Sequence, residues 1–199
     1  MMENIYDKTL AFVKERLKEE KVVGLDHALR VLKGCEFLGQ GEKVDMDVLR
    51  IASLLHDISI PALGRKGHHE ESARIAETFL REQGYPEEKI TAVGYIIRAH
   101  SRYEGPEPKS KEAEILYDAD RLDFIGAIGI VRGIIRGMSE KFGEEYIGDI
   151  AKFPTLFESL KEIAGKKVYT TKAKKISDGR LEIIDKFISW LMKELEFKN

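Results

Sequence analysis

The chain has 199 residues, of which 43% are hydrophobic and 34% are charged. This mixture is typical of a globular protein with a charged surface and excludes a disordered chain. Its 33 Lys and Arg against 35 Asp and Glu give a net charge of −2, so no bulk positive charge indicates binding to long nucleic acid or to an anionic membrane. The one cysteine, Cys35, excludes an internal disulfide framework and a cysteine-rich zinc site.

Neither a membrane span nor a targeting segment is evident in the sequence. The longest unbroken apolar run, residues 124–131, is far shorter than the roughly 20 residues that a bilayer requires. The N-terminus lacks the basic-then-apolar layout of a signal peptide. We therefore expect a cytoplasmic protein with no membrane partner.

In the first third of the chain, apolar spacing predicts three helices, over residues 5–18, 26–38 and 45–60. Asp26 is suited to cap the second helix, and Asp45 or Asp47 the third, because short acidic side chains accept hydrogen bonds from first-turn amides. Pro61 is expected to end the third helix, since the residue before a proline avoids the helical conformation. A basic loop follows at residues 64–67.

Further helices are predicted over residues 69–83 and 86–100, separated by Gly84 and started by Pro86. A loop rich in Gly and Pro covers residues 101–110, and a helix from residue 111 passes Leu122 and is open to continuation past Ile135. Weaker patterns cover residues 144–164, and Ser177 or Asp178 is suited to cap a closing helix. With no repeat or long linker, we predict one all-α, single-domain bundle over residues 1–199, with C-terminal helices at 144–197 packing on a core at about 22–137.

The strongest local signal is His56-Asp57, at the end of the apolar run 51–55. A charged group in that position needs solvent or a positive partner, and imidazole with carboxylate suits Mn, Fe, Co, Ni or Zn. Histidines at the ends of several helices, together with acidic residues inside an apolar helix, can converge in the interior of a bundle. The other candidates of this kind are His27, His68, His69, His100, Asp118, Asp120 and Asp123.

The order His27, then His56-Asp57, then an aspartate of Asp118-Ala119-Asp120 resembles the HD-domain superfamily of metal-dependent phosphohydrolases. Residues 118–123, the following 126–130 and the stretch 171–174 before the last helix are similar to a subgroup of small, mostly uncharacterised bacterial and archaeal members. The resemblance implies a helical bundle of the HD-domain type. It also implies a divalent ion (Mn, Co, Ni, Fe, Zn or Mg) held by His27, His56, Asp57 and Asp120.

Periodicity alone does not choose between Asp118 and Asp120 as the ligand. Their side chains point about 200° apart on a helix, so one ion does not easily take both. The superfamily pattern Ala-Asp-x-Leu places the ligand at Asp120 and leaves Asp118 a surface or hydrogen-bonding role. Asp123, one turn further on, could orient a ligand through a hydrogen bond, and we group it with the substrate-binding candidates.

The resemblance leaves His68 and His100 two roles, either as ligands of a second ion or as hydrogen-bond partners of the substrate phosphate. The alternative is an ordinary histidine at a helix end, which the helix dipole stabilises in the case of His100. We name Asp57, His68 and His100 as catalytic candidates. Arg65, Lys66 and His69 are the further substrate-binding candidates, because a basic loop beside His68 suits a phosphate.

The function implied is that of a metal-dependent phosphohydrolase, which cleaves a phosphate ester or anhydride of a nucleotide or other small phosphorylated metabolite with metal-activated water. The alternative is a non-catalytic HD module that binds metal or nucleotide and acts through a partner. Homo-oligomer formation is left open. Some relatives carry a Glu-Asp pair after His-Asp, whereas this chain has Ile58-Ser59-Ile60-Pro61, so the detailed nucleotidase or alarmone-hydrolase mechanism is not implied.

Other features predict structure. Glycines at helical spacing between residues 126 and 137 indicate close helix packing, and Arg132 with Arg136 indicates a solvated helix face in preference to a phosphate site. Cys35, Phe187 and Trp190 are predicted to lie in the core.

Overall fold

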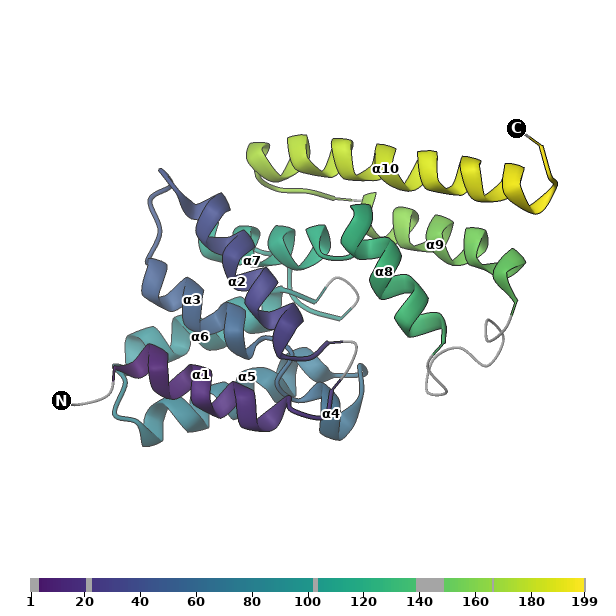
Figure 1. Cartoon of the computed structure of the whole chain (residues 1–199). Coiled ribbons are helices and arrows are strands. Elements are labelled where there is room, and N and C mark those ends of the chain that lie inside the picture. Colours follow the sequence, from purple (N-terminus) through teal and green to yellow (C-terminus); the bar gives the residue numbers. More distant parts are fainter. Residues whose placement is uncertain (1–3, 21–22, 102–103, 139–148, 166, 199) are drawn as a thin grey trace. The chain divides into compact units, whose positions relative to one another are not determined.

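Every regular element of the described chain is helical, which confirms the all-α prediction (Figure 1). The computed structural model describes residues 4–20, 23–101, 104–138, 149–165 and 167–198. Within these residues no helix is long and apolar enough to span a membrane. The elements are α1 (Ile5–Arg16), α2 (Leu25–Gly39), α3 (Met46–Leu55), α4 (Ile60–Leu63), α5 (His68–Glu82), α6 (Glu87–Ala99), α7 (Lys111–Leu122), α8 (Gly126–Gly137), the 3-10 helix η1 (Ile150–Lys152), α9 (Phe153–Gly165) and α10 (Thr171–Leu195).

The chain divides into two compact units, residues 1–120 and 121–199. The division falls inside α7, between Asp120 and Arg121. The organisation of residues 1–199 as one domain stays a prediction, as does the packing of the C-terminal helices on the core. Residues 144–148 of the predicted C-terminal segment lie outside the described residues.

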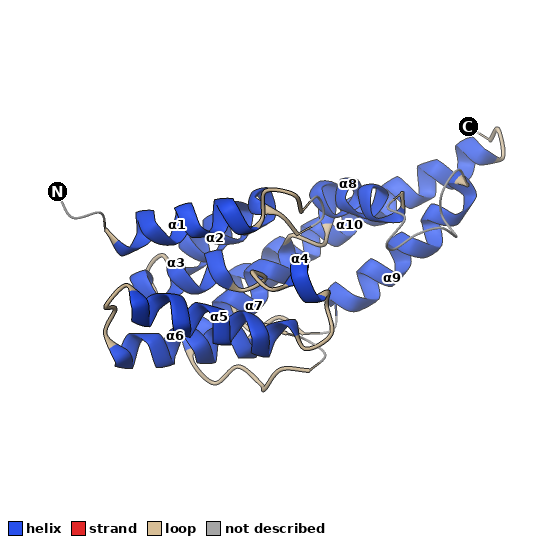
Figure 2. Cartoon of the chain, turned by 90° about the horizontal axis from the view of Figure 1, so that it is seen from below, coloured by secondary structure: helices blue, strands red, loops and turns tan. Residues whose placement is uncertain are grey.

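The first unit is built on two helical hairpins, α2–α3 and α5–α6, with short connections (Figure 2). Apolar residues at helical spacing give each helix a face to bury, and α3 packs against α1, α2, α5 and α6. Leu49, Leu55, Leu80 and Ile97 are completely buried between them. In an antiparallel hairpin the start of one helix lies beside the end of the other, and this arrangement positions the histidines described below.

Several helix boundaries differ from those predicted. Gly24, and not Asp26, precedes α2, while Asp26 pairs with Arg30 one turn on. Asp45 caps α3 as predicted, its side chain accepting from two amides at 3.1 Å. The helix ends at Leu55, because the chain turns and starts α4 with Pro61 in its first turn, where proline needs no amide hydrogen.

The later boundaries differ as well. The helix from residue 111 ends at Leu122, and Gly126, with φ +74°, opens α8 as a separate helix, so no single helix continues past Ile135. The closing helix begins seven residues earlier than a Ser177 or Asp178 cap implies, since the Thr170 hydroxyl accepts from the Ala173 amide at 3.3 Å. The prediction of Ser177 or Asp178 as the cap of the closing helix is therefore wrong.

The second unit contains α8, α9 and α10, which pack on one another. A Cβ on Gly133 would lie 3.0 Å from Phe157 and 3.1 Å from Leu160, which confirms close packing at that glycine. Arg132 is buried and pairs with Asp123, so its prediction as part of a solvated face is wrong. Phe187 and Trp190 are 36% and 58% exposed and do not lie in a core, whereas Cys35 of the first unit is buried as predicted.

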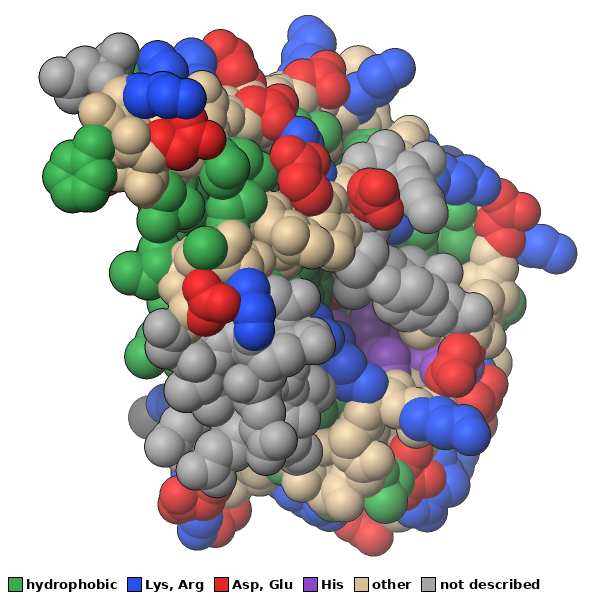
Figure 3. Space-filling view, turned by 90° about the vertical axis from the view of Figure 1, so that its right-hand side faces the viewer, with side chains coloured by type: hydrophobic (Ala, Val, Ile, Leu, Met, Phe, Trp, Pro, Cys, Tyr) green, Lys and Arg blue, Asp and Glu red, His purple; other side chains and the backbone are tan. Residues whose placement is uncertain are grey.

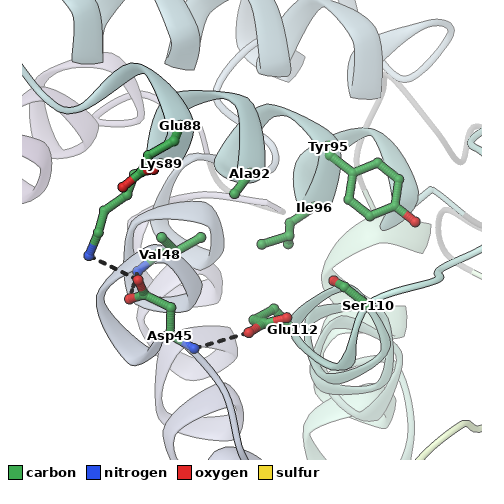
Figure 4. A pocket seen from close by; sticks show the side chains of 9 residues that line it. All are labelled: Asp45, Val48, Glu88, Lys89, Ala92, Tyr95, Ile96, Ser110 and Glu112. Atoms are coloured by element: carbon green, nitrogen blue, oxygen red, sulfur yellow. Dashed lines mark hydrogen bonds and ion pairs between the residues drawn. The ribbon is translucent and has the colours of Figure 1, made fainter.

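A pocket of about 320 Å³ lies where α3, α6 and α7 begin (Figure 4). Val48, Ala92 and Ile96 supply its apolar lining, and Lys89 pairs with Asp45 across one end at 2.9 Å. Its lining contains no histidine and neither Asp57 nor Asp120, so the pocket is distinct from the candidate site described below.

Candidate metal centre

The α2–α3 hairpin brings His27 and His56 together. His27 is in the first turn of α2 and His56 directly follows α3, so the antiparallel packing makes them neighbours. Their Nε2 atoms are 3.2 Å apart, and both side chains are completely buried. The local sequence places each histidine at a helix end, and the packing of α2 on α3 brings the two together.

The α5–α6 hairpin repeats the arrangement with a second pair. His68 is the first residue of α5 and His100 directly follows α6. Their Nε2 atoms are also 3.2 Å apart, and both residues are buried. Two hairpins that share no evident sequence repeat therefore present the same pair of imidazole nitrogens.

The orientation of three of the four rings is fixed by main-chain carbonyls three residues earlier in the chain. The Nδ1 atom of His56 donates to the Ser53 carbonyl at 2.8 Å, and those of His68 and His100 donate to Arg65 and Ile97 at 2.5 Å. An imidazole that donates from Nδ1 has, when neutral, a lone pair on Nε2. Two such lone pairs facing each other require a proton or a metal ion between them.

Asp57 lies between the two pairs and turns one oxygen to each. Its Oδ2 is 3.6 Å from His27 Nε2 and 3.5 Å from His56 Nε2. Its Oδ1 is 3.5 Å from His68 Nε2 and 3.4 Å from His100 Nε2. The carboxylate is thus placed to serve both pairs at once.

Asp120 of α7 reaches the first pair only. Its Oδ1 is 3.3 Å from His27 Nε2 and 3.8 Å from His56 Nε2. Asp118 is completely buried, so a surface role for it is wrong, and it is in neither of the groups able to hold an ion. Asp120 is in neither group either, so the choice of Asp120 over Asp118 as a metal ligand stays a prediction.

These donor sets fit divalent cations. His27, His56 and Asp57 form one group of converging ligand atoms, and Asp57, His68 and His100 form another. Separations of 3.2–3.6 Å within each group place a central point about 2.0 Å from every atom, close to the length of a zinc–nitrogen bond. Asp57 Oδ1 and Asp120 Oδ1 are buried and accept no well-formed hydrogen bond from the described residues. Buried carboxylate oxygens without donors favour a bound cation.

The electrostatics of the centre show what a cation would meet. Burial acts to raise the pKa of Asp57, but the facing histidines outweigh it and lower that pKa well below its usual range. The pKa of Asp120 is lowered in the same way, mainly by His27. Burial lowers the pKa of His56 to about 4. For His100 burial is outweighed by Asp57, which raises the pKa of this imidazole.

Two buried serines that sequence reasoning missed connect the segments of the centre. The Ser59 hydroxyl donates to the His68 carbonyl at 3.0 Å and lies 2.9 Å from the Ser72 hydroxyl. Ser72 Oγ also accepts from the Ser59 amide at 3.2 Å. This network ties the segment after Asp57 to the start of α5. Single serines carry no sequence pattern that would have identified them.

The predicted substrate-binding residues are distributed unevenly. Arg65 and the exposed Lys66 lie in the loop that enters α5, directly before His68. His69 is buried next to the centre, and its Nδ1 is 3.8 Å from a Glu104 oxygen. Asp123 belongs to the second unit, where it is paired with Arg132. Figure 3 shows some histidine surface on one face of the molecule.

Fold and site together define the class of protein: an all-helical protein with a buried histidine–aspartate centre suited to divalent cations. The family model of the HD domain matches residues 24–125, a span that contains both histidine pairs, Asp57 and Asp120. The chain therefore belongs to the HD-domain family.

Relatives with known sequences or structures agree with this assignment. The chain is 27% identical to the uncharacterized protein YpgQ of Bacillus subtilis over 177 residues, which cover 85% of this chain and 82% of that protein. It is similar to the crystal structure of an HD-superfamily hydrolase from Bacillus thuringiensis, with a TM-score of 0.67, 27% identity and 96% of both chains covered. A predicted HD superfamily hydrolase from an uncultured Thermotogales bacterium gives a TM-score of 0.66, 27% identity and coverage of 94% and 91%. The chain thus resembles HD-superfamily hydrolases over nearly its whole length.

Proposed function

We propose that this protein is a metal-dependent phosphohydrolase that acts on a nucleotide or another small phosphorylated metabolite. The observation that carries the proposal is Asp57, whose two oxygens face two separate histidine pairs at 3.4–3.6 Å. One carboxylate shared by two imidazole pairs suits a two-ion site: His27, His56, Asp57 and Asp120 would hold the first ion, and Asp57, His68 and His100 would hold the second.

Divalent ions in this centre would supply the Lewis acidity and the lowered water pKa that hydrolysis of a phosphate ester or anhydride requires. The protein's own contribution is to hold the donors in place. The carbonyls of Ser53, Arg65 and Ile97 fix the imidazole rings, and Asp57 keeps negative charge at the middle of the centre. Mn, Fe, Co, Ni and Zn all suit these ligands, with Mg less suited to the imidazoles.

The basic loop before α5 is the proposed contact for the substrate phosphate. Arg65 and Lys66 are separated from His68 only by Gly67, and the Lys66 side chain is exposed. Guanidinium and ammonium groups pair strongly with phosphate oxygens. His69, buried at the start of α5, joins them in this proposal, and a substrate-binding role for Asp123 of the second unit stays a prediction.

A nucleotide is the substrate class favoured by the comparison with YpgQ, for which a crystal structure of the complex with ADP exists. The match to that structure has 24% identity and a TM-score of 0.65, and covers 95% of this chain. We extend nucleotide binding to this chain as part of the proposal. Net charge near neutrality agrees with a small substrate and not with long nucleic acid. We also propose that the protein acts in the cytoplasm.

The test is release of phosphate or pyrophosphate from nucleoside mono-, di- and triphosphates and from sugar phosphates, with Mn, Co, Ni or Mg added. Chelator-treated protein and Asp57→Ala are the negative controls. Asp47→Ala, which removes an exposed carboxylate from the first turn of α3, is the matched control and should keep full activity.

Turnover that is lost with the chelator and with Asp57→Ala supports the hydrolase. No release by metal-loaded protein across the panel contradicts it. ADP binding without turnover, measured by calorimetry, would then identify the alternative, a non-catalytic HD module that works through a partner.

A further inference from the structure

Helix α5 begins without a capping side chain from its own segment. Gly67 precedes it at φ +67°, and no neighbouring side chain accepts a hydrogen bond from the first turn. The Gly67 amide donates instead to Glu104 Oε2, at 2.7 Å and 37 residues further along the chain. Helix starts need acceptors for their free amides and are stabilised by negative charge. Here the carboxylate of Glu104, from a loop distant in the sequence, supplies an acceptor oxygen and the negative charge.

The same carboxylate contacts a second group of this turn. Glu104 Oε2 is 3.8 Å from Nδ1 of His69, a buried atom that forms no hydrogen bond with the described residues. His68, which stands between Gly67 and His69, is one of the two histidines of the second pair. Glu104 therefore contacts the residues on both sides of a proposed metal ligand.

Glu104 is also tied to the other member of that pair. It lies four residues after His100, in a segment whose ends are joined by a hydrogen bond from the Gly105 amide to the Ser101 carbonyl at 3.3 Å. A Cβ on Gly105 would lie 2.2 Å from the Arg98 carbonyl oxygen and 2.9 Å from that of Ser101. Only glycine permits this close return to the end of α6, and the return places Glu104 at the start of α5.

We propose that Glu104 is a positioning residue for the second ion, an inference that rests on the two-ion site of the proposed function. The α5–α6 hairpin is closed at one end by the turn at residues 83–86. At the other end Glu104 joins the segment after His100 to the residues around His68. Both interactions of Glu104 described above are with residues at the start of α5, so its effect should be selective for the His68–His100 pair.

The test is titration of chelator-treated full-length protein with Mn²⁺ by calorimetry, with the bound metal counted after dialysis. Wild type should bind two ions per chain. Glu104→Ala should bind the second ion about 10- to 100-fold more weakly and the first ion unchanged, as is usual when a group supporting a metal ligand is removed. Glu104→Gln keeps an acceptor oxygen for the Gly67 amide and should restore most of the second affinity.

Glu107→Ala is the matched control, because it removes a carboxylate from the same loop and keeps the main-chain carbonyl that accepts from Tyr95. It should leave both ions at wild-type affinity. The inference is overturned if wild type binds a single ion, if Glu104→Ala binds both ions normally, or if it weakens both equally, as a loss of general stability would. Because the readout is metal binding, absence of turnover in the wild type counts against the hydrolase and not against the role of Glu104.

Discussion

Replacement of Asp57 by Asn tests the shared carboxylate on which the two-ion site depends. The amide keeps the size of the side chain but removes its charge and one acceptor oxygen. Since Oδ2 faces the His27–His56 pair and Oδ1 faces the His68–His100 pair, this one change should weaken both ions together.

The expected magnitude follows from the distances in the centre. Two unit charges 4 Å apart interact by about 4 kcal/mol at an effective dielectric constant near 20. The Asp57 carboxylate oxygens lie 3.4–3.6 Å from the four Nε2 atoms. An ion bound between a pair of Nε2 atoms and Asp57 would therefore lie less than 4 Å from the carboxylate. Water that enters and protons that rearrange offset part of the loss. We expect each ion to lose about 2.8 kcal/mol of binding free energy, which is a roughly 100-fold weaker affinity.

The assay is Mn²⁺ titration of chelator-treated protein, with folding of each variant checked by circular dichroism. His27→Ala and His100→Ala serve as single-site comparisons, and each should lose one ion of the two. Asp47→Asn, which changes an exposed carboxylate in the first turn of α3, should lose neither. If folded Asp57→Asn retained one ion at wild-type affinity, the carboxylate would not be shared and the reasoning would be refuted.

Three further predictions concern pH, the serine network and helix packing. As the pH falls, protons compete with metal for Nε2. In the second pair burial lowers the pKa of His68 whereas Asp57 raises that of His100, so His100 takes its proton at a higher pH than His56, whose pKa is about 4. Dialysis at stepwise lower pH should therefore release the second ion before the first. Ser59→Ala removes the donor to a buried carbonyl and should lower the free energy of unfolding in urea by about 1–3 kcal/mol, whereas Ser159→Ala, whose hydroxyl is exposed, should change it by less than about 0.5 kcal/mol. Gly34→Val places side-chain carbons where a Cβ already meets α7 at 3.2 Å, and it should cost about 1–3 kcal/mol and weaken the first ion, which uses Asp120 on α7, more than the second.

Each of these has a result that contradicts it. Release of both ions at one pH, or of the first before the second, would show that the proton on His100 does not govern binding. Equal free energies of unfolding for Ser59→Ala and Ser159→Ala would show that the Ser59 hydrogen bonds do not stabilise the fold. Unchanged affinity for the first ion in Gly34→Val, with both ions still bound, would separate the α2–α7 contact from the position of Asp120.

Much of the helical structure could be predicted, because helix formation leaves a local signature in the sequence. Apolar residues at helical spacing located α2, α3, α5 and α6 within a few residues, and the Asp45 cap was found from its residue type alone. The caps Gly24 and Thr170 were missed, since several nearby residues were equally suited. Arg132 was misread because its partner, Asp123, precedes the helix and shares no periodicity with it.

The sequence indicated which residues are candidates for the site, but not how their side chains contact one another. The resemblance to HD domains, carried by the order of His27, His56-Asp57 and the aspartates at 118 and 120, implied one ion and left a second open. Neither showed that Asp57 divides its two oxygens between two pairs, nor that Ser59, Ser72 and Glu104 support them. Hydrogen bonds between residues up to 37 positions apart leave no mark on local pattern.

The sequence by itself determined which segments are helical and which side chains stand at their ends, because both depend on near neighbours in the chain. The tertiary structure alone decided that two antiparallel hairpins place four imidazoles in two pairs of 3.2 Å. The physical reason is that a hairpin's alignment depends on how its apolar faces pack, so the meeting of its two ends is a property of the folded core and not of either helix.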